Sequence, residues 1–160
     1  MDERTRALEL LYRDRYVAFR NTLATVTGSY DSARDVVQET FVRAIRKRRD
    51  FRGDGSLEAW VWRIAFRTAL EQRKARHAAA EINGSFDPAL PEPERDLELA
   101  AAVRSLPPRK RLAVFLHYFA DLSYADIAIA LGISEGTVAA TLSQARAALA
   151  DALDPEGAQR

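Results

Sequence analysis

The sequence predicts an all-α protein made of two small helical domains joined by a flexible acidic linker, with a helix-turn-helix in the C-terminal domain. Three observations support this fold class. Apolar residues recur at helical spacing in both halves of the 160-residue chain. A stretch at residues 78–94, rich in proline and acids and without periodicity, separates the halves. Two capped helices joined by a glycine turn follow near the C-terminus.

Composition narrows the class of protein. The apolar share of 48% is typical of a globular chain, and no stretch approaches the roughly 20 apolar residues of a membrane span. There is no cysteine, and the two histidines, His77 and His117, are isolated. No glycine-rich phosphate loop or metal-ligand cluster is visible. We therefore expect a cytoplasmic protein that is not an enzyme, without membrane insertion, metal or cofactor.

The net charge of +1 conceals a strong asymmetry along the chain. Residues 43–76 carry 11 Lys/Arg and 4 Asp/Glu, a net charge of +7, whereas residues 77–108 carry a net charge of −4. A block of this sign in a nearly neutral protein is typical of a surface that binds a polyanion. A solvated helix face with excess arginine is the plainer alternative.

The N-terminal domain, residues 1–77, contains three helical segments and two breaks. The apolar series of the first two segments are Leu8, Leu11, Tyr12, Val17 and Phe19, then Val36, Val37, Phe41, Val42 and Ile45. Gly28 and Ser29 separate these segments, and Asp31 or Ser32 is the expected cap of the second. The turn RGDGS at residues 52–56 follows. A third helix then begins at Ser56 or a neighbour and runs to about Arg76.

The C-terminal domain, residues 95–153, begins with a helix near Asp96 that stops at Pro107 and Pro108. The next helix has an apolar face of Leu112, Phe115, Leu116 and Phe119. Residues 154–160 are expected to fray.

A helix-turn-helix pattern completes this domain. Ser123 caps a short helix, Gly132 forms the turn, and Ser134 caps the last helix. The inward face of the last helix is Val138, Leu142, Ala145 and Leu149. Any two packed helices would share this periodicity, so the pattern alone leaves the motif open.

Two longer motifs carry a family resemblance. The segment SARDVVQETFVRAIRKRRDFRGDGSLEAWVWRIAFRTAL resembles region 2 of the extracytoplasmic-function (ECF) sigma factors of RNA polymerase. The segment LPPRKRLAVFLHYFADLSYADIAIALGISEGTVAATLSQARAAL resembles their region 4. Both occur in the order of that family, and DVVQETFVRA and LSYADIAIALGISEGTV are the most specific parts.

The region 2 helix that contains QETF places Asp35, Gln38 and Glu39 at i, i+3 and i+4, on one polar face. From the residues alone, this face is either solvated or a docking surface. The resemblance implies that it docks on the clamp coiled coil of the polymerase β′ subunit, with Phe41 and Arg43 in the contact. The resemblance also implies that the β flap of the core polymerase is a partner.

Cations and aromatic residues alternate through the basic block. Cations attract phosphates, and aromatic rings can stack on unpaired bases. The resemblance implies that this segment recognises and melts the −10 promoter element, while loop 51–57 holds a flipped-out base. The expected contacts are Arg46, Lys47, Phe51, Arg52, Gly53, Asp54, Trp62, Arg63, Phe66, Arg67, Arg73 and Lys74. Core packing is an alternative for Trp62 and Phe66, and we expect it for Trp60.

Region 4 departs further from the family pattern. Along residues 133–149 the only charged side chains are Glu135 and Arg146. The residues expected to contact the −35 element are Arg109, Ser134, Gly136, Thr137, Ala140, Thr141, Ser143, Gln144 and Arg146. Ile129 stands where the family commonly has Glu, so it is either tolerated surface or faces a partner.

The resemblance implies a sigma factor that directs core RNA polymerase to promoters and is held by an anti-sigma factor. The neutral recognition helix motivates an alternative, a sigma-like decoy that engages an anti-sigma factor without driving transcription. The basic block argues against a decoy, which has no need of DNA melting. An ordinary helix-turn-helix regulator is a third possibility, but it leaves the QETF helix and the basic block unexplained.

Overall fold

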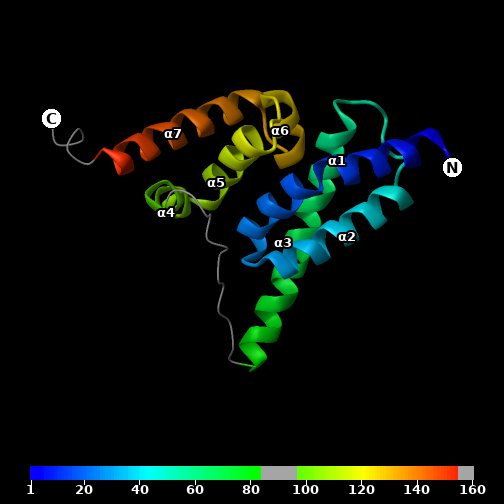
Figure 1. Cartoon of the computed structure of the whole chain (residues 1–160), viewed down its shortest axis with the longest axis horizontal. Helices are drawn as coiled ribbons and strands as arrows, with labels where there is room; N and C mark the ends of the chain where they lie inside the picture. The colour runs from blue at the N-terminus through cyan, green and yellow to red at the C-terminus, as the bar shows by residue number, and fades with distance from the viewer. Residues whose placement is uncertain (84–96, 155–160) are drawn as a thin grey trace.

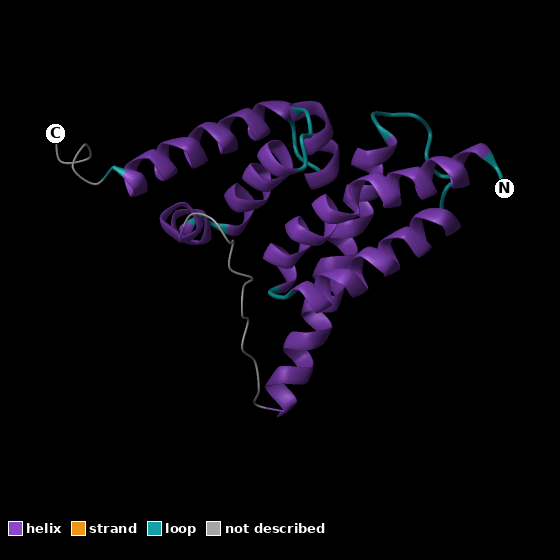
Figure 2. Ribbon diagram, viewed as in Figure 1, coloured by secondary structure: helices purple, strands orange, loops and turns teal. Residues whose placement is uncertain are grey.

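The computed structural model describes residues 1–83 and 97–154, and these residues form helices with no strand among them (Figures 1 and 2). The elements are α1 (Glu3–Thr27), α2 (Tyr30–Arg46), α3 (Leu57–Asn83), α4 (Leu97–Ser105), α5 (Pro108–Val114), the π-helical turn η1 (Phe115–Phe119), α6 (Tyr124–Leu131) and α7 (Glu135–Leu153). The all-α class predicted from the sequence is confirmed.

Helices α1, α2 and α3 pack together and form the N-terminal half, here called region 2. Asp2 caps α1 by accepting a hydrogen bond from the Thr5 backbone N–H. The predicted cap of α2 is wrong, because Ser29 holds that position and accepts from the Ser32 N–H. The reason lies in Gly28, whose left-handed φ of 88° ends α1 and brings the extended Ser29 directly before the new helix.

The core of region 2 is built around Trp62, which is fully buried and stacks on Phe19 with ring centroids 3.9 Å apart. Leu8, Val36 and Val37 are also buried, as their spacing predicts. Four members of the predicted apolar series are exposed instead: Tyr12, Val17, Val42 and Ile45. Since α1 and α2 bury only the sides that face each other and α3, apolar residues just outside those stripes remain at the surface.

Helix α3 is longer than the sequence prediction, which ended it near Arg76 and began the linker at residue 78. It continues to Asn83. The added segment HAAAEIN is rich in alanine, the strongest helix former, and no Gly or Pro interrupts it before residue 84. Residues 84–94 of the expected linker lie outside the described residues.

Helices α4 to α7 form the C-terminal half, here called region 4, and most of their predicted boundaries are confirmed. Pro107 and Pro108 separate α4 from α5, Ser123 caps α6, and Ser134 caps α7. The glycine between α6 and α7 has a φ of 69°, the left-handed conformation of a helix C-cap. The predicted helix-turn-helix is therefore present.

One part of region 4 was not predicted. Between α5 and α6 the chain forms a π-helical turn in which the Ala120 N–H donates to the Phe115 carbonyl at 3.0 Å. The extra residue in such a turn rotates the following side chains. Phe119, predicted as core, is consequently 60% exposed.

Among the described residues no single helix is long and apolar enough to cross a membrane, whereas α6 and α7, bent by 102°, reach that length and composition only as a pair.

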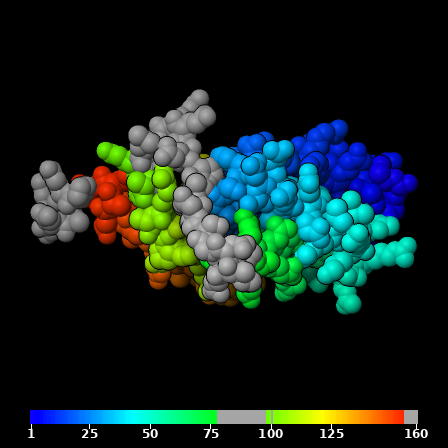
Figure 3. Space-filling view, turned by 90° about the horizontal axis from the view of Figure 1, so that it is seen from below, coloured from blue at the N-terminus to red at the C-terminus, as the bar shows by residue number. Residues whose placement is uncertain are grey.

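Regions 2 and 4 pack against each other along α3 and α6, and α5 and η1 also contact α1. Figure 3 shows the two halves side by side. Arg15 of α1 connects the two regions, because it pairs with Glu58 of α3 at 2.9 Å and donates a hydrogen bond to the Ala120 carbonyl of region 4. Buried apolar residues of both halves form one continuous core.

Candidate nucleic-acid and protein interfaces

The first candidate surface is the outward side of α2. Asp35 and Gln38 are exposed there, as the sequence predicts. Val42 and Ile45, each 41% exposed, continue the same side at i+7 and i+10 from Asp35. The sequence interpretation placed these two residues in the core. Their exposure makes the α2 face mixed, with carboxylate and amide groups at one end and aliphatic groups at the other.

Two residues expected on this face serve the fold of region 2. Phe41 is buried, with its ring packed edge-on against Tyr12 and Phe19, so its assignment as a surface contact is wrong. Arg43 bonds Glu39 at 2.9 Å and Glu71 of α3 at 2.7 Å. These bonds, first that to Glu39 and then that to Glu71, raise the pKa of Arg43 above its usual value. Arg43 thereby joins α2 to α3 and orients Glu39.

The second candidate surface is the basic surface of region 2, which consists of the exposed cations Arg46, Lys47, Arg52, Arg63, Arg67, Arg73 and Lys74. They come from the end of α2, the following loop and α3. Among the contacts described, Arg73 meets His77 at 3.4 Å, and no carboxylate pairs with any member of the set. Exposed guanidinium and ammonium groups of this kind suit phosphate binding.

Trp62 and Phe66 do not belong to that exposed surface. Trp62 has no exposed area, and its indole N–H donates to Glu58 at 3.3 Å. Phe66 is 7% exposed and stacks on Trp62 with centroids 5.6 Å apart. The predicted base stacking by Trp62 is therefore wrong, because its position on α3 faces α1. Phe66 is covered by region 4, as described below.

The loop between α2 and α3 is short and exposed. Gly53 and Gly55 both adopt a φ of 83°, which lets the backbone turn sharply. Arg52 and Asp54 point into solvent, while Phe51 is half-buried against Trp60 with ring centroids 5.6 Å apart. This loop thus projects polar backbone and two charged side chains beside the basic surface.

The third candidate surface is the outer face of α7. Its N-terminus is ordered by Ser134, whose Oγ accepts from the Thr137 N–H at 3.1 Å. Gly136, Thr137, Ala140, Ser143 and Gln144 are exposed, as expected for a helix that reads DNA. Thr141 is not: it is 9% exposed and its hydroxyl donates to the Thr137 carbonyl at 2.6 Å. Its expected contact with the −35 element is wrong in this arrangement.

Arg146 is held by two aromatic hydroxyls, a contact that no local sequence pattern predicts. Its guanidinium donates to Tyr118 at 2.6 Å and to Tyr124 at 3.2 Å. The hydrogen bonds that Arg146 donates to Tyr124 and Tyr118 raise the pKa of its guanidinium group. The one cation on α7 among the described residues is thus hydrogen-bonded to η1 and α6, beside the outer face.

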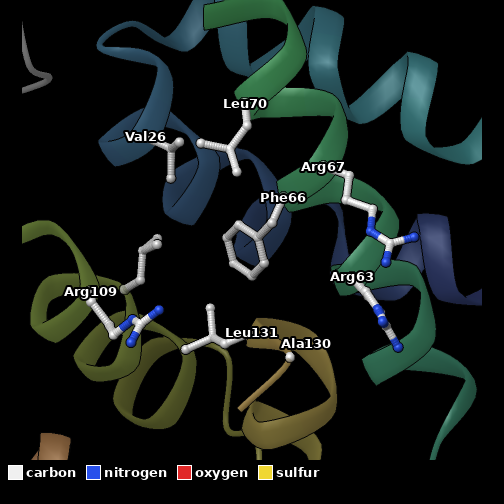
Figure 4. A pocket seen from close by; sticks show the side chains of 10 residues that line it. Val26, Arg63, Phe66, Arg67, Leu70, Arg109, Ala130 and Leu131 are labelled. Atoms are coloured by element: carbon white, nitrogen blue, oxygen red, sulfur yellow. The ribbon is translucent and has the colours of Figure 1, made fainter.

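A cleft of about 300 Å³ lies where the two regions meet. Figure 4 shows Phe66 pointing from α3 toward Leu131 of region 4, with Arg109 on the opposite side from Arg63 and Arg67. Arg109, expected to contact the −35 element, is exposed and lines this cleft. The cleft therefore has an apolar floor and a cationic rim.

Comparison with known proteins matches two family models to this chain. The family model for sigma-70 region 2 matches residues 11–78, and that for sigma-70 region 4 matches residues 96–149. The RNA polymerase sigma-H factor of Pseudomonas aeruginosa is 33% identical over 143 residues, covering 77% of this chain and 74% of that protein. The RNA polymerase sigma factor YlaC of Bacillus subtilis is 31% identical over 152 residues, covering 88% of each.

Two solved structures share the fold. CnrH, solved in complex with the cytosolic domain of CnrY, is 26% identical with a TM-score of 0.68, over 94% of this chain and 89% of that one. The sigma factor RpoE of Bartonella quintana, solved in complex with the anti-sigma factor NepR, is 24% identical with a TM-score of 0.73, over 90% and 96% of the two chains. The latter similarity supports the fold alone.

Proposed function

This chain belongs to the extracytoplasmic-function (ECF) family of RNA polymerase sigma factors, and we propose that it directs core RNA polymerase to promoters through three separate surfaces. The observation that carries the proposal is their presence on one chain: the mixed α2 face, the basic surface of region 2 and the exposed face of α7. A single-domain regulator needs only the last of these. Catalysis belongs to the polymerase, and the chain acts with it in the cytoplasm.

The α2 face is assigned to the core polymerase. Asp35, Gln38 and Glu39 supply oriented polar groups, and Arg43 holds Glu39 in place. Val42 and Ile45 add apolar area beside them. A docking surface that combines oriented charge with a small apolar part gains both specificity and affinity.

The basic surface of region 2 is assigned to the −10 element. Its seven exposed cations attract the DNA backbone, and the 51–56 loop offers Phe51 and the exposed glycines Gly53 and Gly55 to an unpaired base. Phosphate attraction supplies general affinity, so this half of the chain dominates the strength of DNA binding.

The outer face of α7 is assigned to the −35 element. The N-terminus at Ser134, Gly136 and Thr137 offers backbone N–H groups to a phosphate. Ala140 can contact a thymine methyl group, and Ser143 and Gln144 can donate and accept hydrogen bonds in the major groove. With no free cation on this face among the described residues, α7 contributes sequence discrimination more than affinity.

An anti-sigma factor is the further partner that we propose. The support comes from the family resemblance, which implies such a partner, and from CnrH, which is 26% identical and was solved in complex with the cytosolic domain of CnrY.

Promoter-specific transcription with purified core polymerase tests the function. The expected result is at least one discrete transcript from genomic fragments that depends on adding this chain. Core binding without any specific transcript would instead favour the decoy.

A pair of matched substitutions tests the polymerase surface. Val42→Glu places a charge on the α2 face and is expected to weaken core binding about tenfold or more, since it buries a charge in an apolar contact. Val17→Glu makes the same change at a valine of α1 that is 57% exposed, and core binding should stay as in the parent chain. Equal binding by both variants would contradict the assignment.

A further inference from the structure

Three arginines surround the cleft between region 2 and region 4. Arg63 and Arg67 come from α3, and Arg109 comes from α5 on the opposite side of the opening (Figure 4). No acidic residue of the described chain lines the cleft, and none of the three arginines has an ion pair among the described residues. Like charges on two sides of a narrow opening repel each other. The rim of the cleft is therefore suited to an anion.

A more buried cation, Arg111, lies farther along α5. Its guanidinium donates to the carbonyls of Arg104 and Leu106 at 3.0 and 3.1 Å, while its buried Nε has no hydrogen-bond partner. Burial, and after it the charge of Arg73 on α3, lower the pKa of Arg111. A shift in this direction means that positive charge accumulates here without enough anionic groups to balance it. The excess of cations thus extends along the side where α3 and α5 approach each other.

The floor of the cleft is apolar. Phe66 points from α3 toward Leu131 of α6, and Leu112 of α5 also lines the space (Figure 4). Leu70, one turn after Phe66, lines the cleft and is still 52% exposed. Contact with an apolar group would remove this leucine from water, which an inorganic ion cannot do. The ligand that fits the cleft therefore has an apolar part as well as negative charge.

We propose that this cleft binds a small organic phosphate, whose phosphate group lies between the three arginines and whose apolar group covers Leu70. A phosphate carries more than one negative charge at neutral pH and three strong acceptor oxygens, so it can bond to several guanidinium groups at once. The volume of about 300 Å³ is at the lower end of the range for small-molecule sites and accepts one ring system or a short chain. Nucleotides and short alkyl phosphates share this chemistry.

A bound organic phosphate has a consequence for DNA binding. The site itself stands apart from the proposed function, whereas this consequence rests on the assignment of Arg63 and Arg67 to the −10 element. The same guanidinium groups cannot hold the ligand and a DNA phosphate at one time. The ligand therefore lowers the affinity for DNA and acts as a small-molecule effector of the chain.

Titration calorimetry with three probes at one ionic strength tests the site. Adenosine monophosphate carries a flat ring, hexyl phosphate carries an aliphatic chain, and inorganic phosphate carries neither. At least one organic probe should bind about tenfold more tightly than inorganic phosphate, because it also covers Leu70. The tighter of the two organic probes identifies the kind of apolar group. If neither bound more tightly than inorganic phosphate, the arginines would serve DNA phosphates alone and the proposal would be overturned.

Matched substitutions at an exposed leucine test the apolar part. Leu70→Ser should weaken binding of the tighter organic probe about threefold and leave inorganic phosphate as it is, because only apolar contact is lost. Leu10→Ser makes the same change at a leucine that is 45% exposed on α1, and it should bind all probes as the parent chain does. Both positions lie at the surface, so both variants should keep the far-UV circular dichroism of the parent chain.

A second matched pair tests the contribution of region 4 to the rim. Arg109→Gln should weaken binding of every probe about threefold or more, because it removes a charged donor to the phosphate. Arg6→Gln removes the same charge at an exposed position of α1 and should leave binding as it is. Unchanged affinity for the organic probe in either Leu70→Ser or Arg109→Gln would place the binding outside the cleft and refute the site.

Competition with a single-stranded dT12 oligonucleotide separates the site from the proposed function. A saturating concentration of the tighter organic probe should weaken dT12 binding about threefold or more, because phosphate contacts are lost. Probe binding with unchanged affinity for dT12 would refute the assignment of Arg63 and Arg67 to DNA. A lack of preference for either organic probe would overturn the site and leave that assignment intact.

Discussion

The helices that carry the candidate DNA surfaces are stabilised by different interactions in region 2 and in region 4. In region 2, cations also join the helices: Arg43 links Glu39 to Glu71, and Arg48 bonds Asp2 at 2.6 Å. In region 4, the neutral hydroxyls of Ser123 and Ser134 cap α6 and α7. Substitutions in region 2 should therefore change salt-dependent affinity and acid stability, whereas substitutions on α7 should change base preference.

This difference explains why a nearly neutral recognition helix is sufficient. The two regions belong to one chain, so once region 2 and the polymerase engage a promoter, α7 reaches the −35 element at a high effective concentration. Weak binding by α7 is then enough to add register and selectivity. The attraction to the DNA phosphates can then come mainly from residues 43–76, where the net charge is +7.

The largest expected effect tests whether Trp62 belongs to the core or to the DNA surface. Trp62→Ala should lower the free energy of unfolding by about 3–5 kcal/mol, because it removes a fully buried ring stacked on Phe19. Urea denaturation measures this loss. Trp60→Ala, at a half-buried ring, is the control and should cost less. If Trp62→Ala lost DNA binding and kept the stability of the parent chain, Trp62 would belong to the DNA surface and not to the core.

Much of the fold follows from local sequence signals. The glycine turn at Gly132, the serine caps at Ser123 and Ser134 and the proline break before α5 each act within a few residues. The prediction errors arise because tertiary packing determines which residues at the edge of an apolar helix stripe are exposed. Val42 is exposed because its side of α2 has no neighbour among the described helices.

The next effect, on affinity, concerns the basic surface. Charge reversal at Arg46 and Lys47 should weaken promoter binding and lower the slope of log K against log salt by about 2, one unit for each lost phosphate contact. Fluorescence anisotropy at several salt concentrations measures both quantities. Arg6→Glu with Arg13→Glu makes the same charge change at exposed positions of α1, and its salt slope should stay close to that of the parent chain. An unchanged slope in the first pair would refute the assignment.

The candidate surfaces were only partly predictable. Arg63 and Arg67, predicted as DNA contacts from the charge block, are exposed, as such a role requires. The sequence interpretation assigned Arg146 to DNA. No local pattern indicates that Tyr118, 28 residues away, accepts a hydrogen bond from it. The sequence marked Ile129 as unusual, but its contact with Gly55 depends on how two regions far apart in the chain pack together.

A smaller effect separates readout from affinity on α7. Gln144→Ala should reduce the discrimination between −35 sequences by about 1–3 kcal/mol at one base pair, as expected when a paired amide is lost from the major groove. Competition between −35 variants in promoter binding measures it, and the salt slope should not change. Ala148→Ser alters a neighbouring exposed position and should leave the preference as it is. An unaltered preference in Gln144→Ala would exclude direct readout by that residue.

The smallest effect tests the ionic ties of region 2 through pH. The hydrogen bond from Arg48, followed by those from Thr5, lowers the pKa of Asp2 well below its ordinary value of 3.8. A carboxylate with a lowered pKa stabilises the folded state above the ordinary pKa, and that contribution is lost as the pH falls below it. Asp2→Asn keeps a capping side chain but no charge, so at pH 7 it should unfold a few degrees below the parent chain. The two unfolding midpoints should converge as the pH falls below about 4. A gap that persists at low pH would mean that Asp2 acts through its shape and not through its charge.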